Sequence, residues 1–288
     1  MSGRLFFLES EGGKPAAADS LFHVIPVPYE KTVSYGEGTW RGPAAIIEAS
    51  QQLEAFDGVS VPLERGIYTH EAIDCSGRDA DVLADIERMV AEILAAGKIP
   101  VILGGEHTVS YAPIMAHRNF FGSIGVVHFD AHADLRDEME GNPFAHGCVM
   151  RRVHEKGVPL VQVATRGYCV EERDYRRAND NISYYDAASI YMDNIFRIDF
   201  PAGFPDDIYI SVDVDGFDPS VFPHTGTPVP GGLSWYDFFK FIGSIPLSKR
   251  IRGFDVVELA PEAGSSVSDY AAAQLVYNMM GIITRRMK

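Results

Sequence analysis

Short apolar runs alternate along the chain with longer segments in which apolar residues recur at helical spacing. The runs favour strands that are buried on both faces, and the longer segments favour helices with one apolar side. Strands that alternate with helices are typical of a parallel sheet covered by helices on both faces. The pattern therefore predicts a three-layer α/β/α fold with a mostly parallel sheet of about eight strands.

We expect strands at residues 22–28, 66–72 and 99–103, within 124–134, and at 160–165, 182–185, 208–214 and 251–259. We expect helices at residues 43–56, 79–96, 108–119, 150–157, 171–178, 234–245 and 269–286. The chain has 288 residues, of which 46% are hydrophobic, and neither an internal repeat nor a linker divides it. We therefore predict one domain over residues 1–288, with a large core.

Composition narrows the classes of partner. No run approaches the ~20 apolar residues of a membrane span, and the N-terminus lacks the pattern of a secretory signal, so we expect a cytoplasmic protein. The net charge of −15 disfavours nucleic acid or an anionic membrane as a partner and is compatible with a cationic substrate. The cysteines Cys75, Cys148 and Cys169 form no CxxC motif, so neither a disulfide framework nor a thiolate metal site is indicated.

Two of the predicted strands end in polar residues spaced two apart. The stretch IGVVHFDAHAD contains Asp130, His132 and Asp134, and the stretch IYISVDVD closes on Asp213 and Asp215. Side chains alternate across an extended backbone, so each set can lean toward one side. Carboxylates and an imidazole without thiolate suit divalent manganese better than structural zinc or an iron–sulfur cluster. The excess of negative charge favours two ions that share carboxylates and activate a bridging water.

A further histidine follows the apolar run VILGG. His107 alone is more typical of a hydrogen-bonded structural residue, but the segments GGEH, DAHAD, DVDG and ELAPE all follow predicted strands. Ligands of such sheets bind beyond the carboxyl ends of the strands. The common position of the four segments therefore favours His107 as a member of the same cluster.

Motifs of several other sites are absent from the sequence. Neither glycine-rich phosphate loop, GxGxxG or GxxxxGK[ST], occurs, and no HExxH or GxSxG motif is present. The segment DVDGFDP resembles the start of an EF-hand calcium loop. However, His224 stands where that loop needs a bidentate glutamate, and the residues before DVDGFDP are predicted to form a strand instead of a helix. The sequence therefore lacks the signals of a phosphate-binding loop, a zinc protease and a serine hydrolase.

Three motifs together, GGEH, DAHAD and SVDVDGFDP, resemble the ureohydrolase family of arginase and agmatinase. Further matches are GEGTWRGPAAIIEAS, GTPVPGGLSW and FDVVELAP, and the matches follow the family's order over most of the chain. The resemblance implies an arginase-like fold and two manganese ions per subunit. One ion would be surrounded by His107, Asp130, Asp134 and Asp213. The other would be surrounded by Asp130, His132, Asp213 and Asp215, so that Asp130 and Asp213 bridge.

The resemblance also implies a reaction. A hydroxide held between two cations is a strong nucleophile at neutral pH and would attack the planar carbon of a guanidinium group. Asp134 would orient the hydroxide, Glu258 in FDVVELAP would pair with the guanidinium nitrogens, and His146 in NPFAHGC would carry protons to the leaving amine. No chemistry is assigned to His128, His224 or Cys148.

The substrate is indicated by the loop that follows DAHAD. This loop, LRDEMEGNPFAHG, is charged and acidic and departs from the arginase pattern, while DAHADLRDE and GEGTWRGP resemble agmatinases. The resemblance implies hydrolysis of agmatine to putrescine and urea, a step in polyamine synthesis, by a homo-oligomer, either trimer or hexamer. Arginase or guanidinobutyrase activity is the nearest alternative. An inactive homologue that serves as a binding or regulatory subunit and a structural calcium protein are alternatives from other classes.

Overall fold

The computed structural model describes residues 4–287, and its centre is an eight-stranded sheet. The strand order is β2-β1-β3-β8-β7-β4-β5-β6, and every neighbouring pair is parallel. The strands are β1 (Phe22–Val27), β2 (Ile67–Thr69), β3 (Ile99–Gly104), β4 (Gly125–Phe129), β5 (Leu160–Val163), β6 (Ile182–Tyr185), β7 (Asp207–Asp213) and β8 (Arg250–Val257). All the predicted strands are confirmed, with ends that differ by a few residues.

Seven of the helices in the described part of the chain were predicted. They are α2 (Gly42–Ala49), α3 (Asp79–Ala95), α4 (Tyr111–Phe121), α5 (Val149–Glu155), α6 (Val170–Ala178), α8 (Trp235–Ser244) and α9 (Val267–Arg286). Two short helices, α1 (Glu9–Gly12) and α7 (Ala187–Met192), were not predicted. The helix expected over residues 43–56 is shorter, because α2 gives way to a 3-10 turn at Ser50–Gln52.

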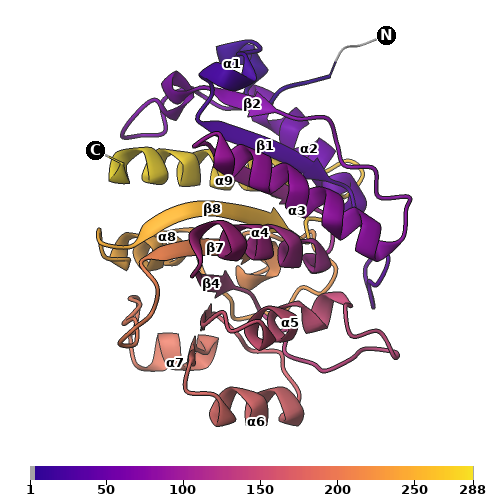
Figure 1. Ribbon diagram of the computed structural model, residues 1–288, viewed down its shortest axis with the longest axis vertical. Coiled ribbons are helices and arrows are strands. Elements are labelled where there is room, and N and C mark those ends of the chain that lie inside the picture. The colour runs from indigo at the N-terminus through magenta and orange to yellow at the C-terminus, as the bar shows by residue number, and fades with distance from the viewer. Residues whose placement is uncertain (1–3, 288) are drawn as a thin grey trace.

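The helices form a layer on each face of the sheet, as predicted. One face packs against α2, α7, α8 and α9 in a single large apolar core, and the other packs against α3, α4 and α5 in two smaller ones. Figure 1 shows α3 and α4 in front of the sheet and α9 behind it. The strands β1, β3, β4 and β5 are buried along their whole length, which is why they appear in the sequence as continuous apolar runs.

The helix α3 illustrates how the sequence determines an element. Val82, Ile86, Val90 and Ile93 fall on one side of it and are buried, as the spacing predicted. Its end is followed by Gly97, whose φ of +71° lies in the left-handed region that glycine adopts at little cost. No helix in residues 4–287 is both long enough and apolar enough to cross a membrane.

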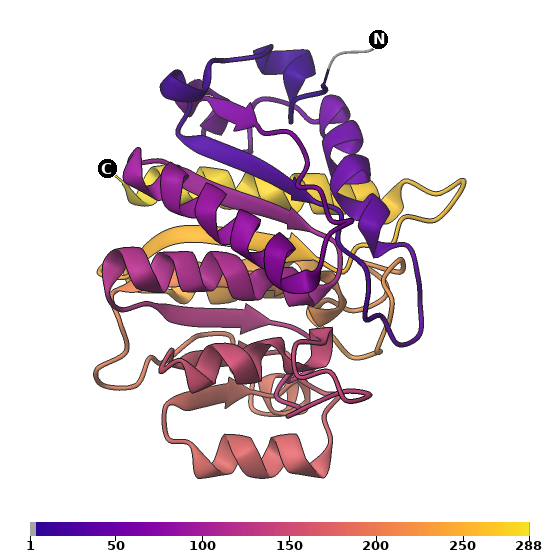
Figure 2. The same ribbon diagram turned by 45° about the vertical axis from the view of Figure 1, so that its right-hand side comes forward.

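The order of the strands determines which loops meet. The last strand of the chain, β8, lies between β3 and β7, and β7 pairs with β4 on its other side. In Figure 2 the arrowheads of the strands are directed to the same side, where the indigo loop after β1 and the orange loops gather. The four segments that carry chemistry in the sequence therefore follow four adjacent strands at one edge of the sheet.

Candidate active site

The six side chains predicted to hold metal lie at this carboxyl edge. His107 begins a 3-10 turn (His107–Ser110) after β3, the DAHAD segment follows β4, and the second acid pair stands at the end of β7. Five of the six are buried and the sixth, His132, is partly exposed. The structure therefore brings together residues that are far apart in the sequence.

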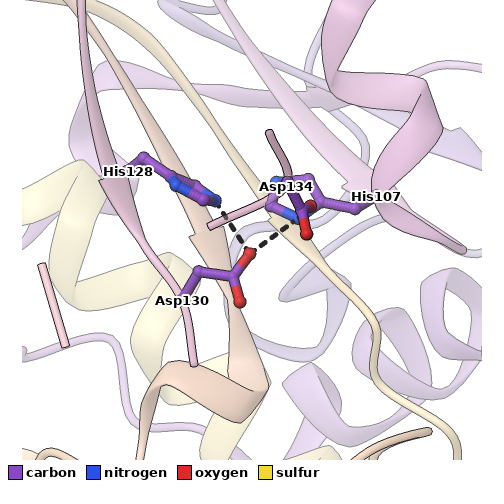
Figure 3. A group of neighbouring side chains, drawn as sticks. All are labelled: His107, His128, Asp130 and Asp134. Atoms are coloured by element: carbon purple, nitrogen blue, oxygen red, sulfur yellow. Dashed lines mark hydrogen bonds and ion pairs between the residues drawn. The ribbon is translucent and has the colours of Figure 1, made fainter. Parts of the chain in front are cut away.

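The Nδ1 atom of His107 faces three carboxylates. It lies 3.1 Å from Oδ2 of Asp130, 3.1 Å from Oδ2 of Asp134 and 3.4 Å from Oδ2 of Asp213. Figure 3 shows the Asp130 carboxylate between the rings of His107 and His128. One ring nitrogen and three carboxylate oxygens thus converge from the ends of three strands.

The other nitrogen of His107 determines which form of the ring is present. His107 Nε2 lies 2.9 Å from Ser211 Oγ, and the Ser211 hydroxyl donates to Asp255 Oδ1 at 2.8 Å. Because the Ser211 hydroxyl donates its only hydrogen to Asp255, it must accept a hydrogen bond from Nε2–H of His107. The other ring nitrogen, Nδ1, is then left with a lone pair. The buried Nδ1 has no hydrogen-bond partner among the described residues. A lone pair that faces three carboxylates is stable only when a proton or a metal ion lies between them.

His132 forms the second half of the cluster. Its Nδ1 lies 3.0 Å from Asp215 Oδ2 and 3.5 Å from Asp130 Oδ1. Asp130 therefore turns one oxygen to each histidine, as a carboxylate that bridges two ions does. Asp213 lies closer to the first half of the cluster, because its Oδ2 faces His107. Its Oδ1 accepts the backbone N–H of Asp215 at 2.8 Å.

His128 also lies within reach of the first half of the cluster. The amide nitrogen of Gln162 donates to Ala133 O at 2.6 Å and to His128 Nδ1 at 3.1 Å. His128 Nε2 must then carry the ring hydrogen, and it donates to Asp130 Oδ2 at 2.8 Å. His128 therefore orients the Asp130 carboxylate and has no free nitrogen to offer a metal ion.

Two of the predicted site residues have an uncommon backbone conformation. Asp134 has a φ of +53° and Glu258 a φ of +63°, in the left-handed region that non-glycine residues seldom adopt. Such conformations cost about 1–3 kcal/mol each and persist where the surroundings enforce them, often at functional sites. Their presence at the ends of β4 and β8 is independent support for a site at this edge.

A single arginine holds the segment after β7 in place. The Arg166 guanidinium donates to the backbone oxygens of Asp215 at 2.7 Å, Phe217 at 3.1 Å and Val229 at 2.6 Å, and to further carbonyls around them. These bonds fix the backbone that carries Asp215. They also bring one positive charge next to the acidic cluster.

The remaining predicted residues border the cluster. The backbone N–H of His107 donates to Glu258 Oε1 at 2.7 Å. A narrow recess lined by Glu258, His146 and the loop of residues 33–36 opens onto the cluster. It adjoins a cavity of about 400 Å³, which is lined among others by Arg136, Tyr168 and Glu172. A small substrate can therefore approach the cluster between His146 and Glu258.

Burial and mutual repulsion shift the pKa values of the side chains in the cluster. Burial raises the pKa of Asp213 and of Glu258 well above the usual range, and neighbouring carboxylates add to the rise. Burial lowers the pKa of His107, but the nearby carboxylates of Asp130 and Asp134 outweigh this effect, so that the pKa is raised well above its usual value. The site thus has more negative charge than its own groups balance, which fits bound cations. Two groups of side chains have free ligand atoms close enough to share an ion: His107, Asp130 and Asp134, and Asp130, His132 and Asp215.

Sequence reasoning did not identify the residues that support these side chains. Ser211, Asp255 and Gln162 are buried polar residues that each interrupt an apolar run within a strand, and this is the signal by which they could have been found. Glu106 is the acid of the GGEH motif, and Arg166 follows β5 without a recognisable pattern. Their partners are distant in the sequence, so the pairings themselves could not be anticipated.

Comparisons with known proteins agree with the architecture and the motifs. The model of the arginase family matches residues 20–281. The N(1)-aminopropylagmatine ureohydrolase of Synechocystis sp. is 38% identical over 97% of this chain and 94% of that protein. The agmatinase of Pyrococcus horikoshii is 30% identical over 93% of each chain.

Solved structures share the fold. The agmatine ureohydrolase of Thermoplasma volcanium superposes with a TM-score of 0.83 at 24% identity and covers 99% of this chain and 96% of that one. The arginase of Medicago truncatula gives a TM-score of 0.81 at 26% identity and covers 92% and 88%. The expected arginase-like fold is therefore confirmed. The chain belongs to the arginase family, and it is a ureohydrolase of the agmatinase type.

Proposed function

We propose that the protein hydrolyses the terminal guanidinium group of a linear guanidino amine and releases urea. The observation that carries the proposal is the unpartnered Nδ1 lone pair of His107, which faces the carboxylates of Asp130, Asp134 and Asp213 beside a recess bordered by Glu258. Such a cluster attracts cations, and the carboxylate of Glu258 in the recess can form an ion pair with a guanidinium group.

The side chains fit two divalent cations with nitrogen and oxygen ligands, and we propose manganese. His107, Asp130, Asp134 and Asp213 would hold one ion, and Asp130, His132, Asp213 and Asp215 the other. Two divalent cations bound there lower the pKa of water and so supply a nucleophile at neutral pH.

The residues of the chain then perform three tasks. Asp134 accepts a hydrogen bond from the nucleophile and orients it toward the guanidinium carbon. Glu258 pairs with the guanidinium nitrogens, since its Oε2 makes no hydrogen bond to any described residue while Oε1 accepts from His107. His146 lines the same recess and gives a proton to the leaving amine.

Agmatine is the substrate that the sequence implies, and its hydrolysis yields putrescine and urea. A second candidate is N(1)-aminopropylagmatine, which would yield spermidine and urea. The N(1)-aminopropylagmatine ureohydrolases among its relatives are 30–38% identical to this chain, and the agmatinases are 30–32% identical. The cavity of about 400 Å³ beside the recess also offers space for the longer amine.

Urea release from a small panel of guanidino compounds tests the proposal. We expect manganese-loaded protein to act on agmatine, on N(1)-aminopropylagmatine or on both, and the ratio of their kcat/KM values selects between the two candidates. Arginine or guanidinobutyrate as the best substrate would overturn both. Manganese-loaded protein that releases no urea from any of the four would favour the alternative of an inactive binding homologue.

A further inference from the structure

Glu106 is a fully buried carboxylate beside the candidate active site, and all its nearby donors come from two segments. Its Oε2 accepts the backbone N–H groups of Lys31 at 2.6 Å and Thr32 at 2.7 Å. Its Oε1 accepts the hydroxyls of Thr32 at 2.6 Å and Thr108 at 2.7 Å. A buried carboxylate is stable only with such complete pairing. Glu106 therefore fixes the loop after β1 to the end of β3.

The Thr32 hydroxyl has three partners, which is its full capacity. It donates its single hydrogen to Glu106. It accepts the backbone N–H of His146 at 3.1 Å, and it lies 3.3 Å from His146 Nδ1. Because the hydroxyl has no hydrogen left, His146 Nδ1–H must be the donor in this last contact. The ring of His146 is thereby held with its hydrogen on Nδ1.

We propose that Glu106 and Thr32 are positioning residues that hold His146 in the Nδ1–H form and reserve Nε2 for proton transfer. This inference rests on the proposed function. Nε2 of the imidazolium gives its proton to the leaving nitrogen as the carbon–nitrogen bond breaks, and it regains a proton from solvent after turnover. Throughout this cycle Nδ1–H stays bonded to Thr32.

The charge of Glu106 strengthens the arrangement. A carboxylate that accepts the Thr32 hydrogen polarises the hydroxyl, so its oxygen becomes a better acceptor for His146 Nδ1–H. The role of Glu106 is thus indirect, through Thr32, and neither residue lines the recess that opens onto the cluster.

Substitutions at Thr32 test the inference. Thr32→Val keeps the shape and removes the hydroxyl, and we expect kcat to fall about tenfold, the size of one lost hydrogen bond. KM and the number of bound manganese ions should stay as in the unmodified protein. Thr32→Ser restores the hydroxyl and should recover most of the loss. Thr108→Val is the matched control, because it removes another donor to Glu106 without touching His146, and its effect should be clearly smaller.

A double substitution separates positioning from a general structural effect. In a His146→Ala background, Thr32→Val should cause no further loss of kcat, because the residue through which it acts is gone. An equal tenfold loss in both backgrounds would overturn the inference. So would equal effects of Thr32→Val and Thr108→Val.

The hydrogen on His146 can also be observed without catalysis. Nitrogen-15 NMR of histidine-labelled, magnesium-loaded protein, assigned with His146→Ala, should show the Nδ1–H form for His146 and a mixture of forms in Thr32→Val. An Nε2–H form in the unmodified protein would overturn the inference, whatever the substrate panel gives. Absence of urea release with the expected NMR result would instead count against the proposed function alone.

Discussion

The backbone N–H of His107 donates a 2.7 Å hydrogen bond to the carboxylate of Glu258, although the two residues are 151 positions apart. The bond ties the turn after β3 to the end of β8. The residue proposed to hold one metal ion and the acid proposed to receive the guanidinium group therefore keep a fixed separation. Fixed geometry of this kind is what reaction between bound groups requires.

Glu258→Gln should separate substrate recognition from metal binding. The amide keeps the shape and can still accept from His107, but it no longer offers a negative charge to the guanidinium group. Truncating one partner of a buried charge pair costs about 3 kcal/mol, so kcat/KM should fall about a hundredfold. Steady-state kinetics and metal analysis check this. A variant with unmodified kinetics would remove Glu258 from the substrate site.

His132→Ala and Asp215→Ala should each weaken the binding of one metal ion. The side chains lie 3.0 Å apart in the second half of the cluster, away from His107 Nδ1. We expect manganese content near one ion per chain and low activity that excess manganese partly recovers. Metal analysis after gel filtration measures this. Two ions per chain in both variants would contradict the proposed ligand set.

Removal of metal should abolish activity reversibly and lower thermal stability. Without cations the buried carboxylates repel one another, and a ligand that binds only the folded state adds stability in proportion to the logarithm of its concentration. After treatment with a chelator, urea release should stop and the thermal midpoint should fall, and both should return when manganese is added. Activity that persists in metal-free protein would refute a metal-dependent mechanism.

The sequence predicted the fold well for a physical reason. Strands such as β3 and β4 are buried on both faces, so they appear as unbroken apolar runs, and α3 has a clear helical spacing. The short helices α1 and α7 were missed because four and six residues are too few to establish a period. The predicted residues of the site were found through motifs at strand ends.

The supporting contacts of the site could not be predicted. Glu106 and Thr32 are 74 positions apart, and Thr32 and His146 are 114 apart. No local pattern connects such residues, because their proximity follows from the order of the strands. The same holds for Gln162, which determines the ring form of His128 from a neighbouring strand.

Arg166→Lys should destabilise the segment that carries Asp215. Lysine cannot reproduce the planar set of donors that reaches the carbonyls of Asp215, Phe217 and Val229. We expect the free energy of unfolding to fall by about 2 kcal/mol and manganese to bind more weakly. Urea denaturation and metal titration measure the two effects. Arg88→Lys, at an exposed pair with Asp85, is the control and should change little.

His117 should make the protein sensitive to acid. Burial lowers the pKa of His117 to about 4, although its hydrogen bond to the Pro113 carbonyl opposes the shift. Below pH ~6.5 the unfolded chain binds a proton that the folded chain does not, so stability is lost as the pH falls from 6.5 toward 4, by about 3 kcal/mol in all. Denaturation of the protein and of His117→Gln at several pH values measures this. Equal pH dependence in both would exclude His117 as the cause.

The position of β8 has a consequence for biosynthesis. The strand is made last and inserts between β3 and β7, so a ribosome-bound chain that stops before residue 250 lacks both the middle of the sheet and Glu258. The acidic segments after β4 and β7 lie on paired strands, but His107 after β3 is not held beside them. The first half of the cluster should therefore bind a cation only after β8 has taken its place between β3 and β7.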